Sequence, residues 1–248
     1  DNTSTVITQQ PTSSSNWNQT IIIDGTTINN ISSFPQPQQW TRLTVLNKKQ
    51  NYLTYNWDDV LSTCLTEQNE IDIQNLVQPA SGVSRDEEID SVRTIASQLT
   101  DSQKIIAEFW AGGPGTVSPP LMFIWLWKEY IRSISSIDCP KMMWSLLDLT
   151  IHLFEGSRVT WRLKKLHMES RPIQEIRRRF SGQSILSWNG NIDGSQWIPY
   201  QANNFITPPF ADFPSGHSHF SKTFALTNIT LVVSISTTAR LAVLTTLT

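Results

Sequence analysis

The feature that most constrains the fold of this chain is a long run of helical patterning, from about residue 86 to residue 180. Within its first segment, apolar residues recur at intervals of three and four, namely Ile89, Val92, Ile95, Ala96 and Leu99. One face of such a segment is apolar, which is typical of an amphipathic helix. Residues 100–103 then have the pattern of a capping box, so a second helix is expected from there to the Gly112-Gly113-Pro114 sequence.

Two further helices are expected in the same run. Pro119-Pro120 opens an apolar stretch that continues to Ile131 and is too short, and too interrupted by charged residues, to span a membrane. Pro140 suits the first turn of a fourth helix. Its expected apolar face consists of Trp144, Leu147, Ile151, Phe154 and Trp161. The chain is therefore predicted to be mainly α-helical, with the helices stacked in one domain.

The segments on either side of the helical run have a different composition. Residues 1–39 are rich in Ser, Thr, Asn, Gln and Pro, which predicts a polar, extended arm. Within this arm, Asp24-Gly25 lies between two β-branched runs, the pattern of a short β-hairpin. After Phe180 the chain is rich in Gly, Asn, Trp and Pro, so we expect a long connection there.

Composition excludes several classes of partner. The formal net charge is −2, which gives no overall electrostatic reason to expect nucleic acid or an acidic membrane. The two cysteines, Cys64 and Cys139, are too few for a disulfide scaffold and lack the spacing of a zinc site. We therefore predict no nucleic-acid partner and no membrane span.

Two short motifs carry most of the chemical information. Lys164 and Arg171 are separated by six residues, and Pro172 after Arg171 indicates that a helix ends there and the chain turns toward the following loop. The second motif is Pro214-Ser215-Gly216-His217, in which Gly216 lets the backbone approach an oxyanion, Ser215 adds a donor and His217 can move a proton near neutral pH. The arginines at 177–179 are expected on a solvated helix face.

Taken together, Lys164-x6-Arg171-Pro172 and Pro214-Ser215-Gly216-His217 resemble the first two of three motifs of the superfamily of vanadium-dependent haloperoxidases and type 2 phosphatidic acid phosphatases. Residues 40–219 resemble the haloperoxidase branch. The resemblance implies a helical bundle of the vanadium haloperoxidase and acid phosphatase type, preceded by the polar arm and hairpin of residues 1–39.

The resemblance also implies a chemistry. Lys164, Arg171, Ser215 and the Gly216 amide would hold vanadate as the cofactor, and His217 would be the acid–base group when hydrogen peroxide oxidises a halide or an organic acceptor. Trp161 and Phe210 occupy positions similar to the halide pocket of the haloperoxidases. Packing in the core is the competing interpretation of these two aromatic residues.

The third motif of the superfamily carries the single histidine that ligates vanadium, and residues 220–248 do not contain it. These residues are rich in Thr and β-branched side chains where the family has a helix, so they are interpreted as a truncated or divergent tail. A partner chain could supply the missing histidine, or His152 or His167 could replace it. Both histidines are more typical of ordinary helix positions.

Three functions follow from these observations. The leading hypothesis is a vanadate-dependent haloperoxidase, with homo-oligomerisation as a family trait. The first alternative is an acid phosphatase on the same scaffold, in which the histidine of the absent third motif would be the nucleophile. The second is a catalytically inactive homologue with a structural or binding role.

Overall fold

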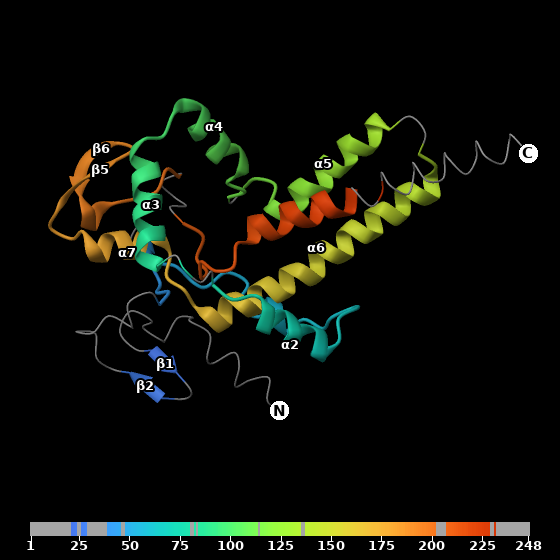
Figure 1. Ribbon diagram of the computed structural model, residues 1–248, viewed down its shortest axis with the longest axis horizontal. Helices are drawn as coiled ribbons and strands as arrows, with labels where there is room; N and C mark the ends of the chain where they lie inside the picture. Colours follow the sequence, from blue (N-terminus) through green and yellow to red (C-terminus); the bar gives the residue numbers. More distant parts are fainter. Residues whose placement is uncertain are drawn as a thin grey trace, which may run out of the picture.

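A computed structural model describes residues 39–45, 48–79, 82, 84–113, 115–134, 137–201, 207–228 and 231, together with the backbone of 21–23 and 26–28. The described part of the chain is mainly helical, as predicted (Figure 1). Its labelled α-helices are α2 (Glu67–Leu76), α3 (Arg85–Ser97), α4 (Asp101–Trp110), α5 (Pro119–Ser133), α6 (Cys139–His167) and α7 (Pro172–Arg179). Residues 216–228 and 231 are also helical. None of the described helices is long and apolar enough to cross a membrane.

Local signals explain where these helices begin. Helices α2, α3 and α4 each start with a reciprocal capping box, including the one predicted at Thr100 and Gln103. Helix α5 begins with Pro119 and Pro120. Helix α6 has Asp138 as its N-cap, whose side chain accepts from the Lys141 amide, and Pro140 lies in its first turn.

Three helices form the main bundle. Helices α5 and α6 and the helix at 216–228 run side by side (Figure 1) and bury a shared apolar cluster. Its buried members are Phe123, Trp127, Ile131, Leu149, Leu153, Phe220 and Leu231. The 29-residue helix α6 is therefore the central support of the described structure.

A second apolar cluster lies between α3, α7 and a β-hairpin. It contains Ile89 and Ala96 from α3, Ile173 and Ile176 from α7, and Ile185. A smaller cluster of Trp40, Tyr52 and Ala211 has Trp161 packed against it, and Trp161 also packs against the main bundle cluster. The site described below lies where these clusters meet.

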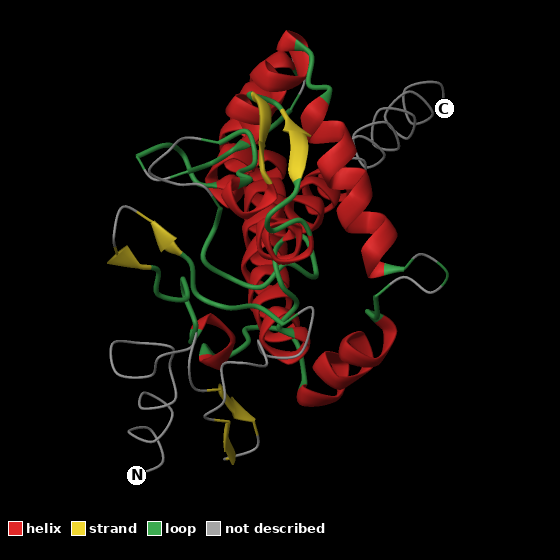
Figure 2. Cartoon of the chain, turned by 90° about the vertical axis from the view of Figure 1, so that its left-hand side faces the viewer, coloured by secondary structure: helices red, strands yellow, loops and turns green. Residues whose placement is uncertain are grey.

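The strands are short antiparallel pairs (Figure 2). Strand β1 (Ile21–Ile23) pairs with β2 (Thr26–Ile28), which confirms the predicted hairpin; the rest of the predicted arm lies outside the described residues. Strand β3 (Thr44–Val45) pairs with β4 (Lys48–Lys49), and β5 (Ser184–Ser187) pairs with β6 (Gly190–Asp193). The 3₁₀ helices are η1 (Trp57–Asp59) and η2 (Gly194–Gln196).

Two expectations about the helices were wrong in part. On α6, Trp144 and Leu147 are exposed, while Leu149 and Leu153 are buried, because α5 and the helix at 216–228 cover a different face from the predicted one. The predicted apolar face of α4 is also largely exposed, as Ile105, Ile106 and Phe109 show.

Two expectations about the connecting segments also need correction. The connection after Phe180 contains the β5–β6 hairpin rather than only loop. Residues 226–228 and 231 are helical despite their Thr-rich and β-branched surroundings. They extend a helix whose packing against α5 and α6 outweighs local propensity.

Candidate functional site

The end of α6 and the start of α7 position Lys164 and Arg171. Helix α6 ends at His167 and is closed by Met168 in the left-handed conformation, so the helix ends before Arg171, not at it as expected. Arg171 is instead the N-cap of α7, in an extended backbone conformation that suits a residue before proline. The short turn between the two helices brings both cations to the same stretch of chain, residues 210–212.

Lys164 is almost completely buried, with 1% of its surface exposed. Its Nζ donates to the carbonyl oxygens of Ala211 at 2.9 Å and Asp212 at 2.7 Å. Burial, and then the nearby positive charge of Arg171, lower the pKa of Lys164 to about 7. Lys164 therefore holds the main chain that leads to Ser215.

Arg171 makes three kinds of contact with the same segment. Its Nε donates to the Phe210 carbonyl at 2.7 Å, its Nη1 lies 3.3 Å from Asp212 Oδ1, and its guanidinium carbon lies 4.6 Å from the centre of the Phe210 ring. Burial lowers the pKa of Arg171. Its Nη2 is buried and has no hydrogen-bond partner among the described residues. One face of a buried cation is thus left open to an acceptor.

Asp212 joins Arg171 to a second arginine that the sequence analysis missed. Arg85, from the first turn of α3, donates to Asp212 Oδ2 at 2.8 Å and to the Ser170 carbonyl at 2.6 Å. Burial acts to lower the pKa of Arg85, but the hydrogen bond and charge of Asp212 outweigh it and raise the pKa. Asp212 lies three residues before Ser215, so it could have been noticed. Arg85 lies 127 residues away from Asp212 and carries no local signal.

Ser215 and His217 lie at the start of the helix at 216–228. The Ser215 side chain accepts from the Ser218 amide at 3.2 Å, which makes it a cap of that helix. The Gly216 amide lies in the first turn, where backbone N–H groups have no partner within the helix. His217 Nε2 lies 2.7 Å from the Trp110 carbonyl. Because a carbonyl only accepts, Nε2 carries the proton and Nδ1 is left as the acceptor nitrogen.

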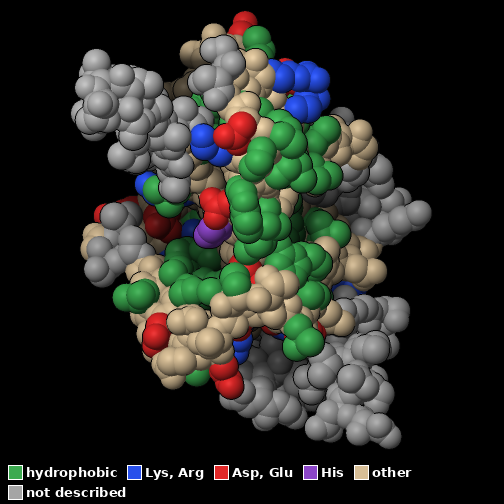
Figure 3. Space-filling model, turned by 90° about the vertical axis from the view of Figure 1, so that its right-hand side faces the viewer, with side chains coloured by type: hydrophobic (Ala, Val, Ile, Leu, Met, Phe, Trp, Pro, Cys, Tyr) green, Lys and Arg blue, Asp and Glu red, His purple; other side chains and the backbone are tan. Residues whose placement is uncertain are grey.

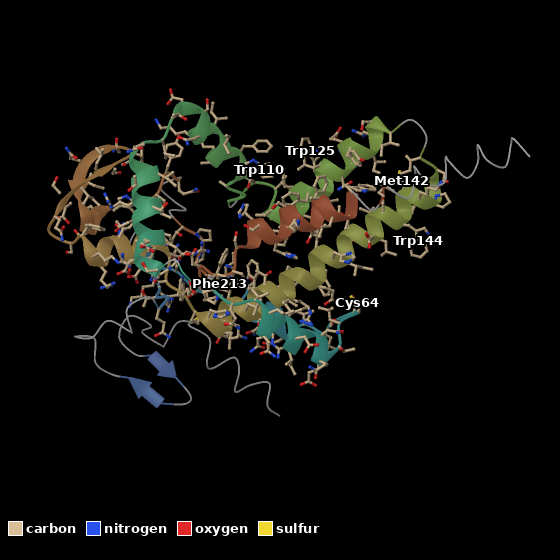
Figure 4. The ribbon with its side chains drawn as sticks, viewed as in Figure 1. Cys64, Trp110, Trp125, Met142, Trp144 and Phe213 are labelled. Carbon is tan, nitrogen blue, oxygen red and sulfur yellow. The ribbon has the colours of Figure 1, made fainter. Side chains whose placement is uncertain are left out.

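A pocket of about 340 Å³ brings part of this set together. Arg171, Asp212 and His217 all line it, with Trp110 from the end of α4 and Trp197 beside them. Figure 4 labels Trp110 and also Phe213, in the segment that leads into the helix at 216–228. Ser215 lines a larger neighbouring cavity instead. The pocket therefore combines a cation, a carboxylate and an imidazole.

The two predicted halide-pocket residues contact each other. The rings of Trp161 and Phe210 are 5.0 Å apart, and the Trp161 indole donates to the Leu53 carbonyl at 3.2 Å. Both rings pack against the cluster of Trp40, Tyr52 and Ala211. The packing role is thus observed, and a role with halide stays a prediction.

The remaining histidines have other surroundings. His152 is exposed on α6 and pairs with Asp148, and the His167 ring packs edge-on against Phe213 at 5.0 Å. Among the residues that the structure describes, no group of three or more His, Cys, Asp or Glu side chains could hold a metal ion. A replacement of the missing third-motif histidine by either residue stays untested.

Comparisons with known proteins agree with this fold. Residues 146–242 match the family model described as VCPO second helical-bundle domain. No curated protein matches the chain. A solved bacterial vanadium-dependent iodoperoxidase has a TM-score of 0.62 at 18% identity, over 81% of this chain and 47% of its own.

Bacterial vanadium-dependent chloroperoxidase is also similar. Its apo-type structure has a TM-score of 0.55 at 16% identity, over 75% of this chain and 44% of its own. Its holo-type structure has the same TM-score of 0.55 at 16% identity, over 78% of this chain and 43% of its own. The chain spans less than half the length of each of these proteins. The chain therefore has the fold of the vanadium haloperoxidases, and its residues 146–242 are similar to the VCPO second helical-bundle domain.

Proposed function

We propose that this chain binds vanadate and serves the oxidation of a halide or organic acceptor by hydrogen peroxide. The observation that carries the proposal is the Nη2 of Arg171, a buried guanidinium nitrogen without a partner among the described residues, on a residue that lines the same pocket as His217. A buried donor that lacks an acceptor is costly, and an oxyanion supplies the acceptor and compensates the charge.

The residues present fit an oxyanion of this kind. Arg171 would donate to it through Nη2, and the Gly216 amide at the start of the helix at 216–228 would add a donor and the favourable end of the helix dipole. Lys164 would contribute positive charge at short range while its Nζ holds the carbonyls of Ala211 and Asp212. Bound vanadate supplies a Lewis-acidic centre that activates hydrogen peroxide toward halide.

His217 would be the group that moves protons. Its bond to the Trp110 carbonyl fixes the ring orientation and leaves Nδ1 as the nitrogen that can accept a proton. Asp212 and Arg85 are positioning residues, because they hold Arg171 through side-chain contacts. The proposal includes a partner chain that supplies the histidine of the third motif.

Activity is tested by bromination and chlorination of a dye by the full chain with hydrogen peroxide, with and without orthovanadate. His217→Ala is expected to abolish vanadate-dependent halogenation, whereas the exposed His152→Ala should retain it. Halogenation by His217→Ala at the level of the unaltered chain would remove His217 from the mechanism. Hydrolysis of phosphate esters without halide dependence would instead favour the acid phosphatase.

Binding is tested separately from activity, since an oxyanion can bind to Arg171 without turnover. Orthovanadate should raise the melting temperature of the full chain, because a ligand that binds only the folded state stabilises it. Arg171→Lys retains the charge but loses the forked donors, and should reduce this rise. An equal rise in both proteins would contradict the assigned role of Arg171.

A further inference from the structure

A second cavity of the described structure is a groove apart from the candidate pocket. It has a volume of about 990 Å³ and lies between α2, α6 and the helix at 216–228. It meets the candidate site only at Pro214 and Ser215. Nothing in the proposed function requires this groove, so its occupant is a separate question.

The residues that line the groove are spaced as helices space a packing face. On α6 they include His152, Gly156, Val159 and Leu163, at intervals of four, three and four. On the helix at 216–228 and its cap they include Ser215, Ser218, Lys222 and Ala225, at intervals of three, four and three. Ile73 and Val77 add one turn from the end of α2. Three helical stripes thus face one common axis, as in a four-helix bundle that lacks one helix.

The dimensions of the groove agree with a helix. A helix about 10 Å across occupies roughly 120 Å³ per residue, so 990 Å³ accommodates about eight residues, or about two turns. Small ligands of the same volume are normally enclosed by residues from many directions. The parallel stripes along α6 and the helix at 216–228 instead suit an elongated partner that packs side chain against side chain.

The polar groups of the groove specify the partner further. His219 lies against Gly156, where an added Cβ would overlap the imidazole ring, so the ring sits close to the floor of the groove. Its Nε2 is buried and has no partner among the described residues. Lys222, one turn further along the helix, is exposed and makes no ion pair with a described residue. Glu155 is already bound by Ser62 and Thr63.

We infer that this groove binds an amphipathic α-helix of another polypeptide, which lays an apolar stripe on α6 and places acidic side chains, three or four residues apart, beside the exposed Lys222. The inference concerns packing alone and stands or falls independently of halide oxidation.

The test uses the full chain and a designed helical peptide of 16 residues, with leucines at helical spacing and two glutamates four residues apart beside the stripe. The binding constant is measured by fluorescence anisotropy, and contact is located by NMR through the His219 ring signal. The peptide should bind and shift that signal. A second peptide with lysines in place of the glutamates should bind about fivefold more weakly, with a difference that shrinks at high salt.

Two serine variants locate the binding site on the chain. Ser221 is exposed and lines the groove, so Ser221→Trp should weaken binding at least tenfold. Ser91 is exposed on α3, outside the groove, so Ser91→Trp should leave binding unchanged. Equal effects of the two variants, no binding of the glutamate peptide, or tighter binding of the lysine peptide would each overturn the inference. So would self-association of the chain that occupies the groove and is lost in Ser221→Trp.

Discussion

Replacement of Asp212 with asparagine tests the charge arrangement around the candidate site. Asp212 lies between Arg85, at 2.8 Å, and Arg171, at 3.3 Å, and the exposed fractions of the Asp212, Arg85 and Arg171 side chains are 24%, 16% and 14%. Asp212→Asn would leave two poorly solvated guanidinium groups without their shared carboxylate. Removal of one partner from a fully buried ion pair costs about 3–5 kcal/mol. Because Asp212 is partly exposed, we expect a loss of about 2–3 kcal/mol in the free energy of unfolding.

The measurement is urea unfolding at neutral pH, followed by circular dichroism and tryptophan fluorescence. The matched control is Asp90→Asn, which removes an Asp–Arg pair with Arg93 at 3.5 Å on the open face of α3, where 53% of the Asp90 side chain is exposed. This control should change stability by less than about 0.5 kcal/mol. Equal effects of the two substitutions would refute the reasoning, since the Arg85–Asp212–Arg171 chain would then be no more than a surface ion pair.

Two further predictions concern residues of α6 itself. The pKa of Lys164 is about 7 in the folded chain and about 10.4 in the unfolded chain, so the unfolded state binds more protons between these pH values. The free energy of unfolding should therefore rise with pH in this range, by at most about 1.4 kcal/mol per pH unit. Lys164→Met should lose this rise when urea unfolding is compared at pH 7 and pH 9. Gly156→Ala should lower the free energy of unfolding by about 1–3 kcal/mol, because the added methyl group meets the His219 ring and this outweighs the better helix propensity of alanine. In a His219→Ala background the same substitution should instead raise the melting temperature in thermal unfolding.

The helices could be predicted because their signals are local. Thr100 and Gln103 form their capping box within one turn, and Pro119, Pro120 and Pro140 lie in first turns where a missing N–H costs nothing. The β1–β2 hairpin likewise depends on a two-residue turn. Each of these elements is decided by residues that are neighbours in the sequence, so the sequence is sufficient to place it.

Which face of α6 is buried could not be predicted in the same way. A helix of 29 residues with many apolar side chains has more than one apolar face, and the choice depends on what packs against it. Trp144 and Leu147 are exposed in the described structure because α5 and the helix at 216–228 cover Leu149 and Leu153 instead. Apolar side chains gather on the side of the molecule that lies to the right in Figure 1 and faces the viewer in Figure 3.

The sequence analysis named the cations of the candidate site but missed their partners. The resemblance to the haloperoxidases implied an oxyanion site at Lys164 and Arg171, but the sequence could not show that Lys164 donates to two carbonyls or that Arg85 reaches Asp212 from α3. Such contacts depend on the tertiary arrangement of segments far apart in the chain. Local patterns therefore indicate which residues carry charge, and only the fold indicates which charges are already compensated.

The balance of charge around residues 210–212 connects the stability of the fold with its proposed ligand. Arg85 and Arg171 bring two cationic groups to this segment, and Lys164, with a pKa of about 7, brings a third that is charged only below that pH; Asp212 and Glu169 bring two carboxylates. Lys164 donates to neutral carbonyls, so its charge is solvated by the backbone rather than cancelled, and the Arg171 Nη2 lacks an acceptor among the described residues. The folded chain therefore carries a desolvation cost that a bound anion would offset and a neutral ligand of the same shape would not. An oxyanion that occupies the pocket should for this reason stabilise the segment leading to Ser215 and His217 as it binds, so that binding and the ordering of the candidate catalytic residues are thermodynamically linked.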